Sequence, residues 1–413
     1  MNKPIITSML DNDLYKFTMM QAVLHQFPGV EVEYAFKCRT EGADLRPYFA
    51  DIADAITDMC LSLSFTQVEL DYLSKLRFIK PDFIQFLKLF KFEREYVHLF
   101  ANARDELEIQ VKGPWLHTIL FEVPILAIVS EIYSTSQLKD ERDYSTANNR
   151  LVEKIELIKK TVDKSVGTDG VPFLFADFGT RRRFSTQWHY NVVTAFKVNV
   201  PKNIIGTSNV LLARLLDLKP IGTMAHEWLQ AHQALYRVAD SQFMAFENWA
   251  KEYRGDLGIA LSDVVGLEAF LCDFDMYFAK LFDGTRQDSG NPHEYACRLI
   301  DHYKSMGIDP TTKTIVFSDG LSIGSAINLW QDFRNKIKVS FGIGTHLTND
   351  FDYNSVWPRN ALQIVLKMVR CNGQPVAKLS DTPGKTMCQD GNYMTYLATV
   401  FARRIKEWKL GQR

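Results

Sequence analysis

Cysteine is sparse in this sequence and follows no pattern that would suggest a metal site or a disulfide framework. Six cysteines are scattered over 413 residues without a Cys-x-x-Cys pair. They are Cys38, Cys60, Cys272, Cys297, Cys371 and Cys388. We therefore expect free thiols in a reducing cytosol.

An excess of charge and a long apolar run are also missing. The 48 basic and 49 acidic residues nearly cancel, which argues against nucleic-acid binding through bulk charge. The most apolar stretch, Thr118 to Val129, is shorter than the about 20 residues of a membrane span and contains Glu122 and Pro124. The N-terminus has no basic start followed by an apolar run, so it does not resemble a signal peptide. We expect a cytoplasmic protein that binds neither nucleic acid nor membrane, with a buried helix at 118–129.

Two styles of sequence divide the chain. Residues 1–140 mix helices and strands, with strand-like alternation at 31–37 and 107–112. Near the end, two β-like runs flank Cys371-Asn372-Gly373-Gln374, and Asn-Gly is a strong hairpin signal. These features predict an α+β N-terminal, sandwich-like domain over residues 1–140, which the C-terminal segment 361–413 joins.

In residues 141–360, seven short β-prone runs alternate with helical segments. The runs are FLFADFGTR, NIIGTSN, PIGTMAH, LGIALSD, FDGTRQDSG, TIVFSDG and IKVSFGIGT. Such alternation is typical of parallel βα units, so we predict an α/β fold with an irregular (β/α) TIM-like barrel. None of the runs ends in lysine, which argues against Schiff-base aldolase chemistry.

Nearly every run ends in a small or reactive polar group. The groups are Asp177 to Arg181, Thr207-Ser208, Thr223 with His226, Ser262-Asp263, Arg286 with Asp288, Ser318-Asp319 and Gly342 to Thr345. Because the carboxyl ends of parallel barrel strands open on one face, we expect these side chains to converge there. Polar residues also cap strands and helices, but seven such ends are hard to explain by capping alone.

Two turns have the composition of phosphate-binding loops. The run IKVSFGIGT ends in Gly342, Gly344 and Thr345, where glycines admit an anion close to backbone N–H groups. Ser318 and Asp319 form a similar turn one strand earlier. A Gly-x-Gly-Thr turn is weak evidence by itself.

The segment GTRQDSGNP places Arg286 two residues before Asp288. Arginine grips a carboxylate or phosphate with two parallel hydrogen bonds, and a carboxylate accepts hydrogen bonds from ribose hydroxyls. The pair therefore suits a phosphorylated sugar beside an acid. The alternative is an ion pair within a turn.

His226 lies between a β-prone run and a helical segment. A neutral imidazole is a nucleophile near pH 7, and a helix N-terminus stabilises a phosphate placed on it. Asp263, at the next strand end, is suited to hold the other ring nitrogen. The alternative is a capping or packed histidine. His232 follows on a different helix face, so the two histidines do not form a metal pair, and no metal site is identified.

The segment FADFGTRRRFS contributes Phe178 and three arginines, Arg181 to Arg183. An aromatic ring at a strand end can stack on a flat heterocycle. Three consecutive arginines often form a solvated face, but their place after a strand end directs at least one of them toward the mouth.

Taken together, these segments resemble the nicotinate phosphoribosyltransferase family of the type II phosphoribosyltransferases. The matching pieces are DNDLYKF (from Asp11), FADFGTRRRFS, GTSNV, GTMAHEW, GIALSD, GTRQDSGNP, FSDG, SFGIGT and AKLSDTPGK (from Ala377). The likeness covers nearly the whole chain, and the order and spacing of the pieces are specific in combination.

The resemblance implies a set of roles, here written as expectations. His226 would be the histidine phosphorylated by ATP, with Asp263 beside it. Charge develops on the leaving pyrophosphate, so we expect Mg²⁺ and arginines, with Arg181 as the candidate, to stabilise its departure. The substrate contacts implied are Tyr15 and Phe178 on the faces of nicotinate, Thr223 and Arg286 toward nicotinate, and Asp288, Ser318, Asp319, Gly342, Gly344 and Thr345 toward ribose and phosphate. Tyr15 would come from the neighbouring subunit of a homodimer. The products would be nicotinate mononucleotide and pyrophosphate, in NAD biosynthesis.

Ser208 bears on the choice of substrate. Related nicotinamide enzymes carry an aspartate at the matching place, whereas a serine can donate a hydrogen bond to a carboxylate. The sequence therefore favours nicotinate over nicotinamide. Two alternatives remain at this stage, a nicotinamide phosphoribosyltransferase and a silent barrel that binds pyridine nucleotides as a regulator or scaffold.

Overall fold

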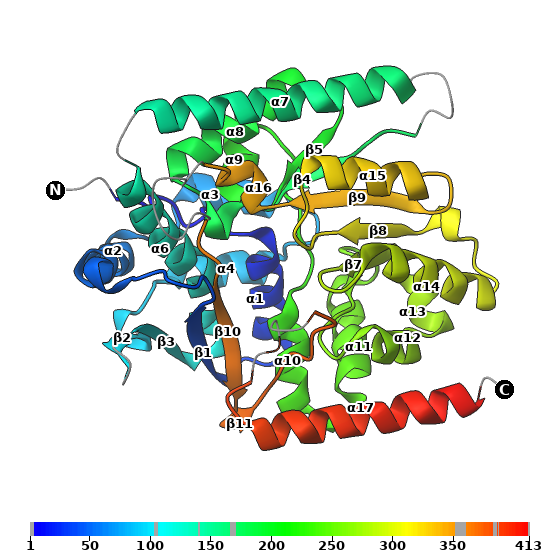
Figure 1. The fold of residues 1–413 in the computed structure, drawn as a ribbon. Coiled ribbons are helices and arrows are strands. Elements are labelled where there is room, and N and C mark those ends of the chain that lie inside the picture. The colour runs from blue at the N-terminus through cyan, green and yellow to red at the C-terminus, as the bar shows by residue number, and fades with distance from the viewer. Residues whose placement is uncertain are drawn as a thin grey trace.

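The computed structural model describes residues 4–102, 106–138, 141–165, 171–351, 361–382, 386 and 388–411 (Figure 1). The two predicted domain boundaries, at 140/141 and 360/361, touch segments outside these described residues, and so do the last three residues of AKLSDTPGK. The boundaries themselves therefore stay a prediction, and the two sheets are described in turn.

An antiparallel sheet forms from the first and last parts of the chain, in the order β11-β10-β1-β3-β2. Its strands are β1 (Glu31–Cys38), β2 (Val97–Ala101), β3 (Leu107–Pro114), β10 (Ile364–Cys371) and β11 (Gln374–Pro375). The alternation in β1 buries Val32, Tyr34 and Phe36 on one face, as expected for a strand packed on a core. Both strands predicted in this region are confirmed.

The predicted Asn-Gly hairpin is also confirmed. Asn372 and Gly373 have φ angles of 48° and 75°, the left-handed pair that a two-residue turn requires. The strand before this turn, β10, pairs antiparallel with β1, with Val32 opposite Cys371. The tail of the chain thus completes the N-terminal sheet.

Helices surround this sheet: α1 (Leu14–Gln26), α2 (Phe49–Ser62), α3 (Gln67–Ser74), α4 (Pro81–Leu89), α5 (Trp115–Thr118) and α6 (Glu122–Gln137). The predicted buried helix at 118–129 corresponds to the turn at Ile119–Phe121 and the first half of α6, whose side chains are all buried. Among the described residues, the stretch Trp115–Gln137 alone is long and apolar enough to cross a membrane. Because 83% of its apolar window lies inside the protein, it is better explained as a core helix.

A six-stranded parallel sheet forms in the second region, in the order β5-β4-β9-β8-β7-β6. Its strands are β4 (Phe175–Asp177), β5 (Ile204–Thr207), β6 (Ile259–Leu261), β7 (Gly284–Gln287), β8 (Thr314–Phe317) and β9 (Lys338–Ile343). All five pairings are parallel, which confirms the predicted βα units. Six of the seven predicted runs are therefore strands.

The prediction of a strand at the remaining run, PIGTMAH, is wrong. Pro220 makes a single bridge to Thr207, and the chain then leaves the sheet. The physical reason is that proline has no N–H to donate to a ladder. The predicted irregular (β/α) TIM-like barrel is confirmed only as a parallel sheet, because no strand pairing joins β5 to β6 among the described residues.

The segment 219–223 nevertheless spans the gap between these two edge strands. Its backbone exchanges hydrogen bonds with Thr207 of β5, at 3.2 Å through Lys219 O and at 2.9 Å through Ile221 N. Its Thr223 hydroxyl donates to Ile259 O of β6 at 2.9 Å. This irregular link holds the start of the following helix, α10, beside the strand ends.

The helices of this region are α7 (Glu141–Ser165), α8 (Thr186–Asn199), α9 (Val210–Leu215), α10 (His226–Leu235), α11 (Ser241–Tyr253), α12 (Leu267–Asp273), α13 (Met276–Leu281), α14 (Pro292–Ser305), α15 (Ile323–Phe333), α16 (Thr345–Thr348) and α17 (Gly391–Gly411). In Figure 1 the long helices α7 and α17 run along opposite edges of the molecule, and α15 covers β9. The C-terminal helix packs on α12, beside the parallel sheet, whereas β10 belongs to the antiparallel sheet.

Buried ion pairs join the N-terminal residues to the parallel sheet. Arg183 donates to both oxygens of Asp11, at 2.7 and 2.8 Å, and both side chains are almost fully buried. Burial by itself would raise the pKa of Asp11, but Arg183 more than offsets this and lowers it. The Leu14 N–H donates to Ser208 O at 2.8 Å, so the start of α1 is attached to the end of β5.

Candidate active site

A cavity of about 520 Å³ opens at the carboxyl ends of the parallel strands. Its lining comes from strand ends, from α10 and from the antiparallel sheet. The residues that bear on the chemistry are Phe178, Arg181, His226, Arg286, Asp288, Ser318, Asp319, Gly344, Thr345, Lys367 and Lys378. The sequence segments predicted to converge thus meet in one opening.

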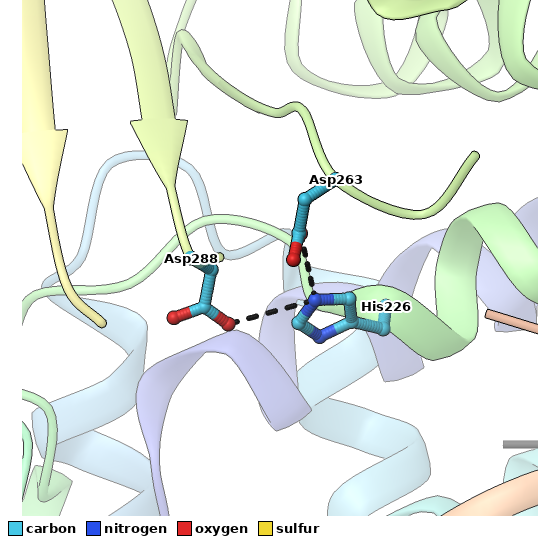
Figure 2. A group of neighbouring side chains, drawn as sticks. All are labelled: His226, Asp263 and Asp288. Carbon is cyan, nitrogen blue, oxygen red and sulfur yellow. Dashed lines mark hydrogen bonds and ion pairs between the residues drawn. The ribbon is translucent and has the colours of Figure 1, made fainter. Parts of the chain in front are cut away.

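His226 is the first residue of α10 and is only 6% exposed. Its Nε2 lies 2.9 Å from Asp263 Oδ1 and 3.5 Å from Asp288 Oδ2 (Figure 2). Its Nδ1 takes part in no hydrogen bond or ion pair with another described residue. With a hydrogen on Nε2 shared with Asp263, the lone pair on Nδ1 is available to an incoming electrophile.

Lys378 is a third partner of the same ring nitrogen, and sequence reasoning assigned it no role. Its Nζ lies 2.9 Å from His226 Nε2 and 2.6 Å from Asp263 Oδ2. The lysine belongs to the AKLSDTPGK segment but follows no barrel strand, so no strand-end signal marked it.

The electrostatics keep His226 neutral. Burial lowers its pKa most, Lys378 lowers it further, and together they outweigh Asp263 and Asp288, for a value of about 4. Asp263 has its pKa well below the usual range, because His226 and Lys378 more than offset the effect of burial. Ser289 donates a further hydrogen bond to Asp263 Oδ2 at 2.7 Å.

The carboxylates beside His226 also raise the question of a metal ion. One ligand atom each of His226, Asp263 and Asp288 lies within 4.8 Å of the others. The ammonium of Lys378, however, contacts both His226 and Asp263, and so occupies the position of a balancing cation. The set therefore does not fit a resident metal ion.

Arg286 and Asp288 face each other at the end of β7. Arg286 Nη2 lies 3.1 Å from Asp288 Oδ2, and its Nε donates to Ser318 Oγ at 2.8 Å. Ser318 in turn donates to Asp288 Oδ1 at 2.8 Å. Burial would raise the pKa of Asp288, but Arg286 and His226 lower it to about 2. The Arg286–Asp288 ion pair, which the sequence analysis gave as an alternative, is present, and both residues line the cavity.

Comparison with known proteins decides the family. The sequence model of the nicotinate phosphoribosyltransferase (NAPRTase) family matches residues 173–405, and the model of its N-terminal domain matches residues 10–130. The chain belongs to the nicotinate phosphoribosyltransferase family.

Relatives and solved structures of this family resemble the chain over nearly its full length. The nicotinate phosphoribosyltransferase of Burkholderia ambifaria is 54% identical over 96% of this chain and 97% of its own, and that of Verminephrobacter eiseniae is 52% identical over 96% and 98%. The crystal structure of the Vibrio cholerae nicotinate phosphoribosyltransferase has a TM-score of 0.90 and 38% identity over 98% and 97% of the two chains. That of the Porphyromonas gingivalis protein has a TM-score of 0.88 and 32% identity, over 96% of this chain and 100% of that one.

In this member of the nicotinate phosphoribosyltransferase family, Phe178 leads from β4 into the cavity, and its half-buried ring lies against β9. A Cβ at Gly342 would come within 2.2 Å of that ring, so Gly342 serves to make room for Phe178 and does not itself line the cavity. Gly344 and Thr345 do line it. Of the turn predicted to bind phosphate, only the second half, Gly344 and Thr345, therefore lies at the cavity.

Replacing Gly342 with alanine should displace the Phe178 ring. A ring atom cannot remain 2.2 Å from a Cβ, and such overpacking costs about 1–3 kcal/mol. We expect a lower melting temperature and a higher KM for the aromatic substrate. Gly324→Ala is the matched control, because its Cβ would meet nothing closer than 3.8 Å. Equal behaviour of the two variants would contradict this role for Gly342.

A second, smaller cavity of about 40 Å³ shares Arg181, His226 and Arg286 with the first and is also lined by Tyr15. The guanidinium of Arg181 lies 5.9 Å from the centre of the Tyr15 ring and 3.5 Å from Glu122 Oε1. Burial raises the pKa of Tyr15 well above its usual value. The structure thus places Tyr15 beside the site of its own chain, and a contribution across a dimer remains a prediction.

Sequence reasoning missed a network of charged side chains beside this smaller cavity, which Glu122, Glu227 and Lys367 line. Lys16 Nζ contacts both Glu122 and Glu227, at 2.7 and 2.8 Å, and all three are buried. Lys367 of β10 lies 3.4 Å from Glu122 and lines both cavities. Burial lowers the pKa of Lys367 to about 8 despite that carboxylate. A lone lysine on a helix or strand gave no signal of this network.

Two predicted substrate contacts, Ser208 and Thr223, are not brought into either cavity. The Ser208 hydroxyl donates to Asp13 Oδ1 at 2.7 Å, and the Thr223 hydroxyl donates to Ile259 O. A hydroxyl has one hydrogen, so neither donates to a ligand in this arrangement. Their role as contacts to nicotinate stays a prediction.

Proposed function

We propose that this chain joins nicotinate to phosphoribosyl pyrophosphate, giving nicotinate mononucleotide and pyrophosphate. The reaction is coupled to ATP hydrolysis through a phosphohistidine at His226. The observation that supports this best is the meeting of His226, Arg286 and Phe178 in one cavity, from elements far apart in the chain. The protein would act in the cytoplasm, in NAD biosynthesis by salvage of nicotinate.

The nicotinate ring lies on Phe178, with its carboxylate toward Arg286. The guanidinium carbon of Arg286 is 5.8 Å from the centre of the Phe178 ring, about the reach of a pyridine carboxylate stacked there. Arg286 contacts Asp288 through Nη2 and Ser318 through Nε, and its Nη1 has no hydrogen bond or ion pair with another described residue. That free edge suits a carboxylate. Tyr15 lines the adjoining smaller cavity of the same chain, so its ring would cover the other face within each subunit of a homodimer.

Phosphoribosyl pyrophosphate lies across the rest of the cavity. Asp288 accepts hydrogen bonds from the ribose hydroxyls, and the turns at Ser318-Asp319 and Gly344-Thr345 hold phosphate oxygens. The pyridine nitrogen attacks C1 of the ribose as pyrophosphate leaves, and Arg181 stabilises its developing charge. Mg²⁺ accompanies the phosphate substrates and neutralises part of their charge.

ATP acts through His226. Nδ1 attacks the γ-phosphorus, the Nδ1–P bond forms, the P–O bond to ADP breaks, and ADP leaves. Asp263 holds the hydrogen on Nε2 and keeps the ring oriented. Phosphorylation reorders the loops at the mouth, and water later cleaves the P–N bond, so ATP drives the reaction without entering the product.

A substrate comparison tests the proposal. Purified protein with phosphoribosyl pyrophosphate, Mg²⁺ and ATP should form nicotinate mononucleotide, and kcat/KM should favour nicotinate over nicotinamide by at least about tenfold because of Arg286. The reverse preference would identify a nicotinamide enzyme. Substrate binding without product and without acid-labile label from γ-labelled ATP would identify a regulator or scaffold.

A further inference from the structure

After β11 the chain crosses the ends of the parallel strands as a strap, residues 377–382. The strap is held by backbone and hydroxyl hydrogen bonds to the loops after β6 and β7. The Leu379 N–H donates to Val264 O at 2.7 Å, and the Gly290 N–H donates to Thr382 Oγ1 at 2.9 Å. This placement brings Lys378, which is 152 residues beyond His226 in the chain, into contact with the imidazole.

Besides burial, Lys378 is the group that opposes protonation of His226 by the neighbouring carboxylates. Two carboxylates, Asp263 and Asp288, lie within 3.5 Å of Nε2, and opposite charges at such distances favour an imidazolium. An imidazolium has no lone pair and cannot accept a phosphoryl group. The Lys378 ammonium opposes this, because it repels a second positive charge and shares the Asp263 carboxylate.

Other charged groups near the ring do not take the place of this lysine. Those that face His226 from the surrounding elements are Arg181, Glu122, Glu227, Arg286 and Lys367, in addition to Asp263, Asp288 and Lys378. Of the described residues, only Asp263, Asp288 and Lys378 have a hydrogen bond or ion pair with Nε2.

We propose that Lys378 is a positioning residue that, together with burial, keeps His226 neutral beside Asp263 and Asp288, so that the ring retains a lone pair. The ammonium Nζ lies 2.6 Å from Asp263 Oδ2 and 2.9 Å from His226 Nε2, so a positive charge is already present where a protonated ring would place a second one. The electrostatic balance described above, with a pKa of about 4 for His226, agrees with this arrangement. The consequence for phosphoryl transfer rests on the proposed function, whereas the state of the imidazole does not.

The first test observes the imidazole directly in the full-length protein. Nitrogen-15 NMR of ¹⁵N-histidine-labelled protein, with His226 assigned by its loss in His226→Gln, reports both tautomer and pKa. The wild type should show a neutral imidazole at pH 7. Lys378→Met, whose side chain is uncharged and one atom shorter, should raise the pKa of His226 by about two units, and Lys378→Arg should keep the wild-type value.

A matched variant separates charge from the mechanical role of the strap. Thr382→Val removes the bond to Gly290 but leaves the ammonium in place, so its His226 titration should equal that of the wild type. An unchanged titration in Lys378→Met would overturn the proposal. The same shift in Thr382→Val and Lys378→Met would overturn it as well, because it would show that strap attachment matters and charge does not.

The second test measures labelling of His226 from γ-labelled ATP. A rise of about two units leaves about a tenth of the imidazole neutral near pH 5, so Lys378→Met should label roughly tenfold more slowly there and approach the wild-type rate near pH 8. Equal rates at both pH values would contradict the proposal. If the wild type itself takes no label, the ATP coupling fails, and the NMR titration still decides the role of Lys378.

Discussion

Changing His226 to alanine should abolish the acid-labile phosphoenzyme and reduce ATP-stimulated nucleotide formation by about 10²-fold or more, to the slow rate seen without ATP. The physical reason is that Nδ1 of His226 is the nucleophile for the γ-phosphoryl group, whereas transfer to nicotinate uses Phe178, Arg286 and Asp288. The measurement is acid-labile label from γ-labelled ATP, together with nucleotide formation with and without ATP.

Two further variants test whether the loss of label comes from the missing imidazole or from a disturbed fold. His226→Asn keeps a polar side chain at the start of α10 and should behave as His226→Ala does. His232→Gln changes the second histidine of the same helix, which is also buried and whose Nδ1 donates to Trp228 O at 2.7 Å. It should still take the label. Undiminished ATP dependence in His226→Ala would show that the nucleophile is elsewhere.

Removal of Arg286 has the second-largest expected effect. Hydrogen bonds to charged groups contribute about 1.5–3 kcal/mol, so Arg286→Ala should raise the KM for nicotinate by roughly 10- to 100-fold. Arg286→Lys keeps the charge but loses the paired donors, so its KM for nicotinate should lie between those of the wild type and Arg286→Ala. Steady-state kinetics with varied nicotinate measure both effects.

Nicotinamide serves as the internal control, because it has the same ring without the carboxylate. If Arg286 binds that carboxylate, Arg286→Ala should reduce the preference for nicotinate over nicotinamide. Equal losses for both substrates would show instead that Arg286 acts only through its contacts with Asp288 and Ser318.

Local patterns were reliable where the determining residues are contiguous. The alternation at 31–37 and the Asn372-Gly373 turn predicted β1 and the β10–β11 hairpin, because side-chain period and left-handed φ depend on neighbouring residues. PIGTMAH failed for a similarly local reason. Its apolar start resembles a strand, but Pro220 cannot donate to a ladder.

Hydrogen-bond partners of individual polar side chains were much less predictable. Ser208 was expected to face the substrate, yet its hydroxyl donates to Asp13, which lies 195 residues earlier. Gly342 was expected at a phosphate, yet it accommodates the Phe178 ring from the neighbouring strand. Each outcome depends on which segment packs opposite, and the periodicity of one strand carries no information on that.

The sequence by itself determined the family, the parallel βα units and the set of strand-end residues that meet in one cavity, since these follow from contiguous motifs and from the common direction of parallel strands. Only the tertiary structure decided which charges surround His226. Lys378 reaches the imidazole because β10 returns to the N-terminal sheet and the strap then crosses the strand ends. Electrostatic interactions depend on distance in space, and the path of the chain alone sets that distance.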